Sequence, residues 1–300
     1  MVRYNPLQGD RGGAEKSPAC ETFRIEIAGL TAGILIEDRR YRDEAVCHYQ
    51  DFTSDRSPAI HLTLRVTNQG HPSSLTDARV EFEGRRVELL ADSSSGRIDL
   101  DTGEGMLVTS ATRPLEELDY LLRIVYALLA FEQGGLLFHA AGIVHNEKAY
   151  CFFGHSGSGK STVARCSATE YVLNDDLVLL LPAGRSWMVH ATPFCNPEQM
   201  HPIPAYAGLS GLYRLVQDRT VFIERMNPAQ AVAEIISNTP VIPANPKFND
   251  RLLDTCGRLL TTTPAFWLHF TPDVSFWDVI APPSDQPSKA DSPCFHNFDS

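Results

Sequence analysis

The 300-residue sequence has no uninterrupted apolar stretch of the roughly 20 residues that a membrane-spanning helix needs. Its first residues, MVRYNPLQGDRGG, lack the apolar core of a signal peptide, so we expect a cytoplasmic protein with no membrane partner. Basic residues are fewer than acidic ones: 26 lysines and arginines against 37 aspartates and glutamates, which gives a net charge of −11. This charge repels a phosphate backbone and no basic cluster offsets it, so we expect no nucleic-acid partner.

Cysteine pairs at metal-ligand spacing are also missing. The seven cysteines include no C-x-x-C pair, which favours reduced thiols over a disulfide framework or a zinc site. Hydrophobic residues at 43% and charged residues at 21% lie near the averages for globular proteins. Composition therefore argues against disordered, collagen-like and coiled-coil classes.

The residue pattern divides the chain into five parts. Residues 1–20 and 281–300 are polar and rich in Gly, Pro, Ser or charge, and we expect both to be flexible. Residues 21–112 carry short alternating runs such as AIHLTLRV, which predict a small antiparallel, β-rich N-terminal domain. Leucines at helical spacing predict one amphipathic linking helix over residues 113–135. Residues 136–280 are predicted to form an α/β domain.

That domain opens on two apolar runs, GLLFHAAGIV and KAYCFFG, which predict a β-hairpin. The next residues, G-H-S-G-S-G-K-S, match the phosphate-binding pattern G-x-x-x-x-G-K-[ST] in full, between a predicted strand and a predicted helix, STVARCSATEY. The glycines allow backbone N–H groups to converge on phosphates, Lys160 can reach the β and γ phosphates, and Ser161 can hold magnesium. A chance glycine-rich turn is the alternative. We predict ATP and Mg²⁺ as cofactors, with the nucleotide bound by Gly154, His155, Ser156, Gly157, Ser158, Gly159, Lys160, Ser161 and Thr162.

Two adjacent carboxylates, Asp175 and Asp176, interrupt the apolar run YVLNDDLVLLL shortly after this motif. Unpaired buried charge is costly, and a metal ion supplies a reason for it. Either aspartate can ligate Mg²⁺, and one can instead take a proton from an attacking hydroxyl. The alternative is a plain Asn-Asp-Asp turn between two short strands. His139, in the first strand of the hairpin, is a third candidate, against the alternative of a core histidine.

These residues resemble the HPr kinase/phosphorylase family and the wider HPr-kinase-like proteins, whose P-loop domain is related to that of phosphoenolpyruvate carboxykinase. The resemblance covers F-H-A-A-G-I-V, F-F-G-H-S-G-S-G-K-S and L-N-D-D-L-V, from about Leu136 to Leu181. In the family a histidine precedes the first loop glycine by 15 residues, and His139 precedes Gly154 by 154 − 139 = 15. The resemblance implies that Asp176 or Asp175 is the catalytic base and that its neighbour lies nearer the metal.

The chain departs from the family in three places. His155 stands where the family usually has an acidic or small residue, the E-[IV]-R-G stretch is missing, and so is the arginine-bearing loop tied to phosphorolysis. Glu198 is a conceivable substitute near the metal. These departures weigh against phosphorylase activity.

We therefore expect a Mg–ATP-dependent kinase that transfers phosphate to a hydroxyl, either a serine of a protein or peptide or a small alcohol. Catalysis is expected from Asp176, Asp175, His139 and Lys160, and metal binding from Ser161 and Asp175. A nucleotide-binding regulatory module with little turnover is the main rival, and a decarboxylating phosphotransferase is a weaker one. The acceptor, the choice of ATP or GTP and the oligomeric state, a homo-oligomer included, stay open.

Overall fold

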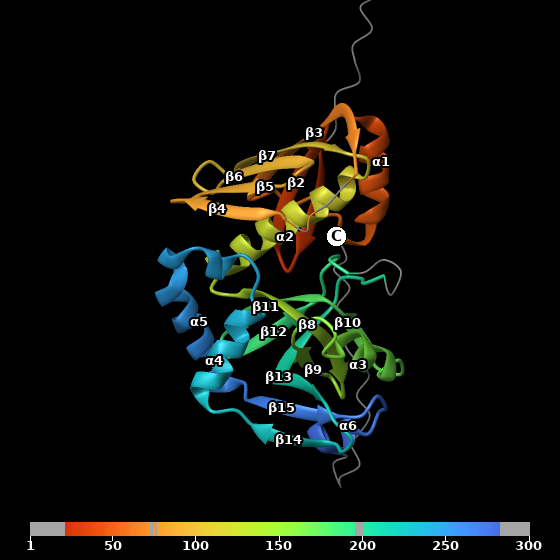
Figure 1. Cartoon of the computed structure of the whole chain (residues 1–300), viewed down its shortest axis with the longest axis vertical. Helices are drawn as coiled ribbons and strands as arrows, with labels where there is room; N and C mark the ends of the chain where they lie inside the picture. Colours follow the sequence, from red (N-terminus) through yellow and green to blue (C-terminus); the bar gives the residue numbers. More distant parts are fainter. Residues whose placement is uncertain (1–21, 73–74, 76, 196–200, 283–300) are drawn as a thin grey trace, which may run out of the picture.

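The computed structural model describes residues 22–72, 75, 77–195 and 201–282, and shows a mixed α/β protein with two sheets. The expected flexible parts, residues 1–20 and nearly all of 281–300, lie outside the described residues. The N-terminal sheet lies above the C-terminal sheet in Figure 1, and a long helix lies between them.

The N-terminal sheet has seven strands in the order β1-β2-β3-β7-β6-β5-β4. The strands are β1 (Phe23–Ile27), β2 (Leu30–Ile36), β3 (Ile60–His71), β4 (Arg79–Glu83), β5 (Arg86–Leu90), β6 (Ser94–Asp99) and β7 (Glu104–Ala111). The prediction of an antiparallel sheet was wrong in part, because β3 runs parallel to both β2 and β7. Alternating hydrophobicity predicts that a segment is a strand, but it carries no information on the direction of its neighbours.

The crossover between the parallel strands β2 and β3 contains α1 (Arg39–His48) and the 3₁₀ turn η1 (Gln50–Phe52). The sequence did not predict α1, because its residues RRYRDEAVCH are mostly polar and only Ala45 is buried. One local signal was present. The side chain of Asp38 accepts hydrogen bonds from the backbone N–H groups of Arg40 and Tyr41, as an N-cap does.

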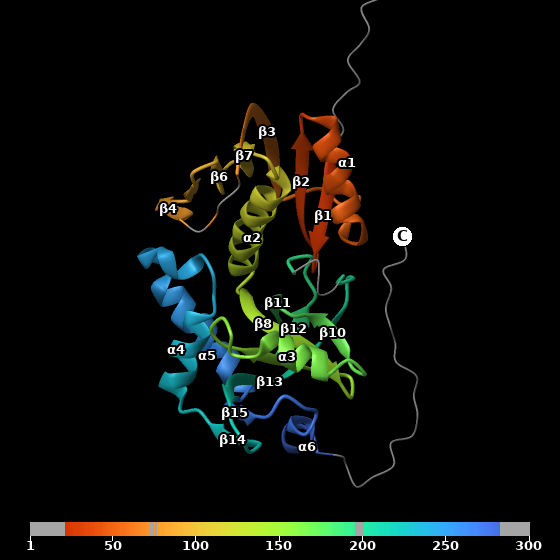
Figure 2. The same ribbon diagram turned by 45° about the vertical axis from the view of Figure 1, so that its right-hand side comes forward.

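Helix α2 (Pro114–Glu132) confirms the predicted helix, but it is not amphipathic. Glu116 is its one exposed residue. Even Glu117 is buried, where its two carboxylate oxygens accept hydrogen bonds from the Ser93 and Ser94 hydroxyls at 2.6 Å each. Figure 2 shows α2 running from the N-terminal sheet down towards β8, and one continuous core joins its side chains to both sheets.

The C-terminal sheet is built around the hairpin of β8 and β9, which confirms the predicted hairpin. The turn residues Asn146 and Glu147 both have positive φ, 49° and 63°, as a tight two-residue hairpin turn requires. The strands are β8 (Leu136–His145), β9 (Lys148–Phe153), β10 (Tyr171–Asn174), β11 (Leu177–Ala183), β12 (Ser186–His190), β13 (Tyr206–Gln217), β14 (Phe222–Arg225) and β15 (Ala265–Phe270).

Strands β9, β13 and β15 run parallel to one another, so their carboxyl ends meet at one edge of the C-terminal sheet. Strand β9 lies between β8 and β13, while β8 also pairs with β11, β11 with β12, and β12 with β13. The hydrogen bonding therefore forms a closed ring of the strands β8, β9, β13, β12 and β11.

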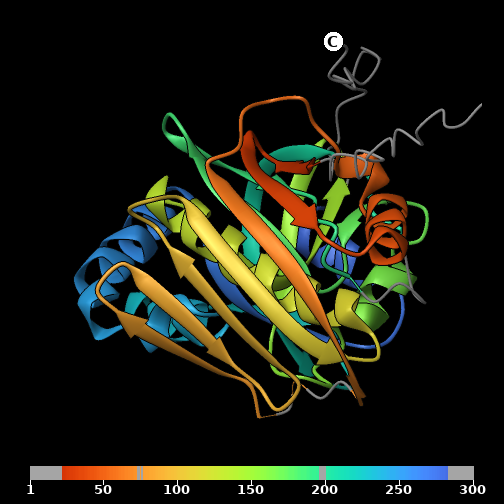
Figure 3. The same ribbon diagram turned by 90° about the horizontal axis from the view of Figure 1, so that it is seen from above.

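Helices cover both faces of the C-terminal sheet (Figure 1). Helices α4 and α5 pack with α2 in the main core, whereas α3 and α6 pack in a second core around Phe152 and Trp277. Figure 3 shows the N-terminal sheet lying across the top of this half. Among the described helices, none is both long and apolar enough to cross a membrane. The helical segments are α3 (Lys160–Cys166), α4 (Pro228–Ser237), η2 (Ile242–Ala244), η3 (Pro246–Phe248), α5 (Asn249–Thr262) and α6 (Phe276–Ile280).

The continuous core predicts that both sheets unfold together. Leu122 is fully buried in α2, so Leu122→Ala should lower the free energy of unfolding by about 2–5 kcal/mol through lost apolar contact and a residual cavity. The control Glu116→Ala, at the exposed position, should change it by less than about 0.5 kcal/mol. Denaturant titration followed by fluorescence and circular dichroism should give one transition. Two separated transitions would contradict the shared core.

Candidate functional site

The glycine-rich loop connects β9 to α3, so the predicted order of strand, loop and helix is confirmed. Helix α3 ends at Cys166 and is shorter than predicted. Gly154, Gly157 and Gly159 have φ values of 149°, 81° and 110°, which residues with a Cβ rarely adopt. A Cβ on Gly159 would also come within 2.6 Å of the Phe270 ring. Glycine is therefore required by the backbone of this loop.

Lys160, the first residue of α3, is buried, and its Nζ donates a hydrogen bond to the carbonyl oxygen of Gly154 at 2.9 Å. Burial lowers the pKa of Lys160 and the charge of Arg214 adds to the effect, while Asp176 and Asp175 oppose it. The ammonium group is thus removed from water and turned back onto its own loop. An anionic ligand there would offset the cost of that desolvation.

Strand β13 and helix α4 hold the loop from the side. Gln217 Nε2 donates to the carbonyl oxygen of Gly157 at 2.9 Å, and Arg214 Nη2 lies 3.1 Å from Nδ1 of the exposed His155. Arg214 Nε also donates to Glu234 of α4 at 2.9 Å. The sequence did not predict these contacts, although a lone arginine in the apolar run YAGLSGLYRLVQ was a usable signal.

The two aspartates lie in the short turn between β10 and β11, which both pair with β8. Asn174 Oδ1 accepts from the backbone N–H groups of Asp176 at 2.7 Å and Leu177 at 2.9 Å. Its Nδ2 donates to the carbonyl oxygen of Thr192 at 2.9 Å. The Asn-Asp-Asp turn is therefore present, and the metal-ligand or base role of its carboxylates stays a prediction.

Asp175 is buried, and its Oδ1 has no hydrogen-bond partner among the described residues. Burial and the charge of Asp176 raise the pKa of Asp175, while its own backbone N–H, the Ser161 hydroxyl and the charge of Lys160 oppose the rise. Ser158 Oγ is likewise buried without a partner in the described part of the chain. Unpaired oxygens beside a lysine indicate a site that is completed by something the chain itself does not supply.

The side-chain oxygens of Asp175 and Ser161 fit Mg²⁺, which prefers hard oxygen ligands and keeps several waters. Asp175 and Ser161 would contribute one oxygen each. The described residues include no cluster of three or more His, Cys, Asp or Glu side chains that could hold a metal. The remaining ligands would be phosphate oxygens and water, as at other magnesium–nucleotide sites.

Asp176 has a partner on each carboxylate oxygen. His139 Nε2 lies 2.7 Å from Oδ1. Arg123 Nη1 of α2 donates to Oδ2 at 3.4 Å. Burial raises the pKa of Asp176, but His139, Arg123 and Lys160 together outweigh it and lower the pKa below its ordinary value. The sequence did not predict Arg123, although it is the one basic residue in the apolar run of α2.

The remaining predicted residues have less definite places. Ser156 is exposed, and Thr162 Oγ1 accepts a hydrogen bond from Arg165 at 3.4 Å. Glu198 lies outside the described residues. The candidate site therefore consists of the loop with Lys160 and Ser161, the two aspartates, His139 and Arg123.

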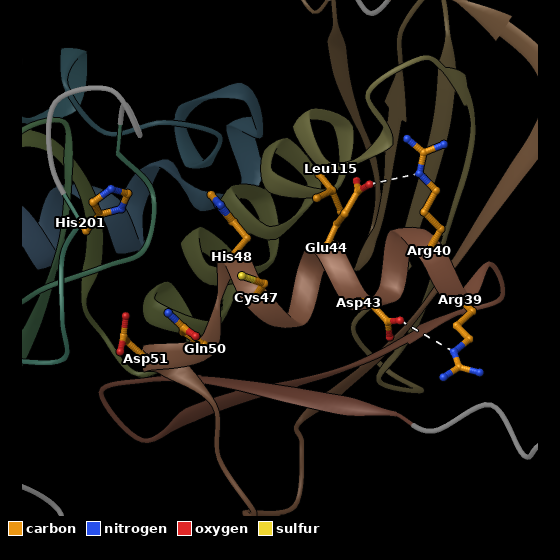
Figure 4. Close-up of a pocket in the computed structure, with 10 residues that line it drawn as sticks. All are labelled: Arg39, Arg40, Asp43, Glu44, Cys47, His48, Gln50, Asp51, Leu115 and His201. Atoms are coloured by element: carbon orange, nitrogen blue, oxygen red, sulfur yellow. Dashed lines mark hydrogen bonds and ion pairs between the residues drawn. The ribbon is translucent and has the colours of Figure 1, made fainter.

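A groove of about 1140 Å³ lies elsewhere, along α1 of the N-terminal half. Figure 4 shows His48 of α1 and His201 on opposite sides of it, with the pairs Arg39–Asp43 and Arg40–Glu44 along the helix. None of the predicted site residues lines this groove.

No protein-family model matches the chain, and no curated protein matches it. The resemblance to HPr-kinase-like proteins therefore rests on the motif residues and their spacing.

Removal of the Asn174 side chain should loosen the aspartate turn. Asn174→Ala leaves two N–H groups and a carbonyl without their buried partner, and each loss costs about 1–3 kcal/mol of stability. Thermal denaturation should show a clear fall in melting temperature, against almost none for Asn68→Ala at an exposed position. Equal melting temperatures for the two variants would contradict this role of Asn174.

Proposed function

We propose that this protein binds Mg–ATP at the loop of residues 154–162 and transfers the γ-phosphoryl group to a hydroxyl. The observation that carries the proposal is Lys160, a buried ammonium that donates to a loop carbonyl and is followed by Ser161, whose hydroxyl lowers the pKa of the buried Asp175. A cation, a hydroxyl and a carboxylate gathered at one glycine-rich loop match what a metal-bound triphosphate requires.

The loop backbone would surround the phosphates. The positive φ values of Gly154, Gly157 and Gly159 turn successive peptide groups, so that their N–H groups can face one anion. Lys160 would exchange its bond to the Gly154 carbonyl for phosphate oxygens and neutralise part of their charge. This is the P-loop arrangement that the resemblance to HPr-kinase-like proteins implies.

The two aspartates would have different roles. Asp175, which is buried and whose Oδ1 has no partner among the described residues, would hold Mg²⁺, which when bound neutralises the charge that develops on the phosphates. Asp176 has a side chain that is 33% exposed, so an acceptor hydroxyl can reach it, and His139 is in contact with it. Asp176 would orient that hydroxyl and take its proton, with His139 holding the carboxylate in place.

The acceptor class follows from this chemistry only in outline. A serine of a protein or peptide and a small alcohol both present the required hydroxyl. The chain lacks the family's E-[IV]-R-G stretch, which favours a second candidate, a nucleotide-binding regulatory module with little turnover. Phosphate transfer from labelled ATP, measured with and without lysate of the source cell, separates the two, because the regulatory module consumes almost none.

Lys160→Ala tests the phosphate cradle. Loss of the charged hydrogen bonds to the triphosphate should weaken Mg–ATP binding by about 10- to 100-fold, while the fold is retained. Lys148→Ala, at an exposed position at the start of β9, is the matched control and should bind like the parent. Titration calorimetry measures both. Unchanged affinity in a folded Lys160→Ala variant would remove Lys160 from the site.

The two aspartates can be separated by their asparagine variants. Asp176→Asn should keep Mg–ATP affinity and lose about 100- to 10,000-fold in transfer rate, as for a lost general base. Asp175→Asn should instead raise the Mg²⁺ concentration needed for half-maximal binding, because one oxygen ligand is lost. Exposed Asp250→Asn serves as control. Parental turnover in both site variants would rule out both roles.

A further inference from the structure

A chain of hydrogen bonds runs from the N-terminal half of the protein to Asp176. The Tyr49 hydroxyl, between α1 and η1, donates to Oδ1 of Asp119 at 3.1 Å. Oδ2 of Asp119 accepts from Nε of Arg123 at 2.8 Å, and Nη1 of Arg123 donates to Oδ2 of Asp176 at 3.4 Å. His139 completes the chain at Oδ1 of Asp176, at 2.7 Å.

The middle of this chain is shielded from water. Tyr49 is fully buried, and the side chains of Asp119 and Arg123 are 19% and 28% exposed. The Arg123 guanidinium also lies over the Phe194 ring, 5.8 Å from its centroid. Ion pairs on an open surface contribute little because water screens them, whereas these groups are held in one geometry from several sides.

We propose that Arg123 is a positioning residue for phosphoryl transfer, and that through Asp119 and Tyr49 it makes the N-terminal half a working part of the site. The inference rests on the proposed function. A carboxylate held at one oxygen can still turn about its last bond, whereas Asp176 is held at Oδ1 by His139 and at Oδ2 by Arg123. The plane of the carboxylate, and with it the lone pairs offered to an acceptor, is thereby fixed.

The alternative is that Arg123 only fastens α2 to the C-terminal half. The two roles differ in their consequences, because a fastening arginine affects stability, whereas a positioning arginine affects the rate constant of transfer at nearly constant nucleotide affinity. The chain offers a matched control. Arg251 of α5 also ties to α2, through the Phe131 carbonyl at 2.6 Å, and none of its hydrogen bonds in the described residues involves Asp176.

The first experiment measures ATP hydrolysis by the full chain, with water in place of the acceptor hydroxyl. Arg123→Met should lower kcat by about 10- to 100-fold, as expected for a misplaced reacting group, while KM for Mg–ATP stays within about twofold. Arg123→Lys should recover part of the loss. Tyr49→Phe, which keeps the buried ring, should lower kcat by about threefold or more. Arg251→Met should lower the melting temperature and leave kcat unchanged.

The second experiment needs no turnover. A crystal structure of Arg123→Met with Mg–ADP should show the Asp176 carboxylate rotated from the orientation that it has in the parent, while the glycine-rich loop keeps its conformation. A carboxylate that keeps its position, or a parental kcat in folded Arg123→Met, overturns the inference. Calorimetry on the parent protein separates failure of this inference from failure of the proposed function. A parent that does not bind Mg–ATP contradicts the proposed function, whereas a parent that binds it leaves only the role of Arg123 to be tested.

Discussion

Helix α2 is buried on nearly all sides, and both sheets pack against it. The N-terminal sheet packs against one side of the helix and the C-terminal sheet against the other, so neither sheet has a complete core without it. Polar groups on α2 must then find partners inside the protein. Glu117 accepts hydrogen bonds from two serines. Asp119 accepts from Tyr49 and Arg123, and Arg123 also donates to Asp176. The candidate site is thus coupled to the packing of the linking helix.

The two aspartates of the site have different electrostatic surroundings. Lys160, Arg123 and His139 lie around Asp176, whereas only Lys160 of these three acts on Asp175, and the pKa values of the two aspartates move in opposite directions. Asp175 is buried beside the charge of Asp176, and its own backbone N–H and the Ser161 hydroxyl offset this only in part, so its pKa rises. Asp176 has two close partners, so its pKa falls. Neighbouring carboxylates of one dipeptide are in this way given unlike environments, as sites that divide metal binding from proton transfer require.

Local features of the fold and site could be predicted from the sequence, and features that depend on distant segments could not. The hairpin turn at Asn146, the glycine loop and the helix over α2 each follow from a pattern within about 20 residues. The parallel pairing of β3 depends on the crossover between β2 and β3 and on the three strands β4 to β6 that precede β7, and no local pattern specifies either. Arg123 lies 53 residues before Asp176, and only the folded chain shows that the two meet. His139 was found because its spacing from Gly154 matches a family, and its chemistry alone would not have singled it out.

The pairing of β9 bears on how the protein is made. This strand leads into the glycine-rich loop and pairs on one side with β8, its immediate predecessor, and on the other with β13, which begins at Tyr206. A ribosome adding roughly 5–20 residues per second needs several seconds to pass from Phe153 to the end of β13. During that interval the nascent chain carries β9 with an open, apolar edge. The backbone of the glycine-rich loop therefore reaches its final form only after the polypeptide some 60 residues downstream has left the exit tunnel.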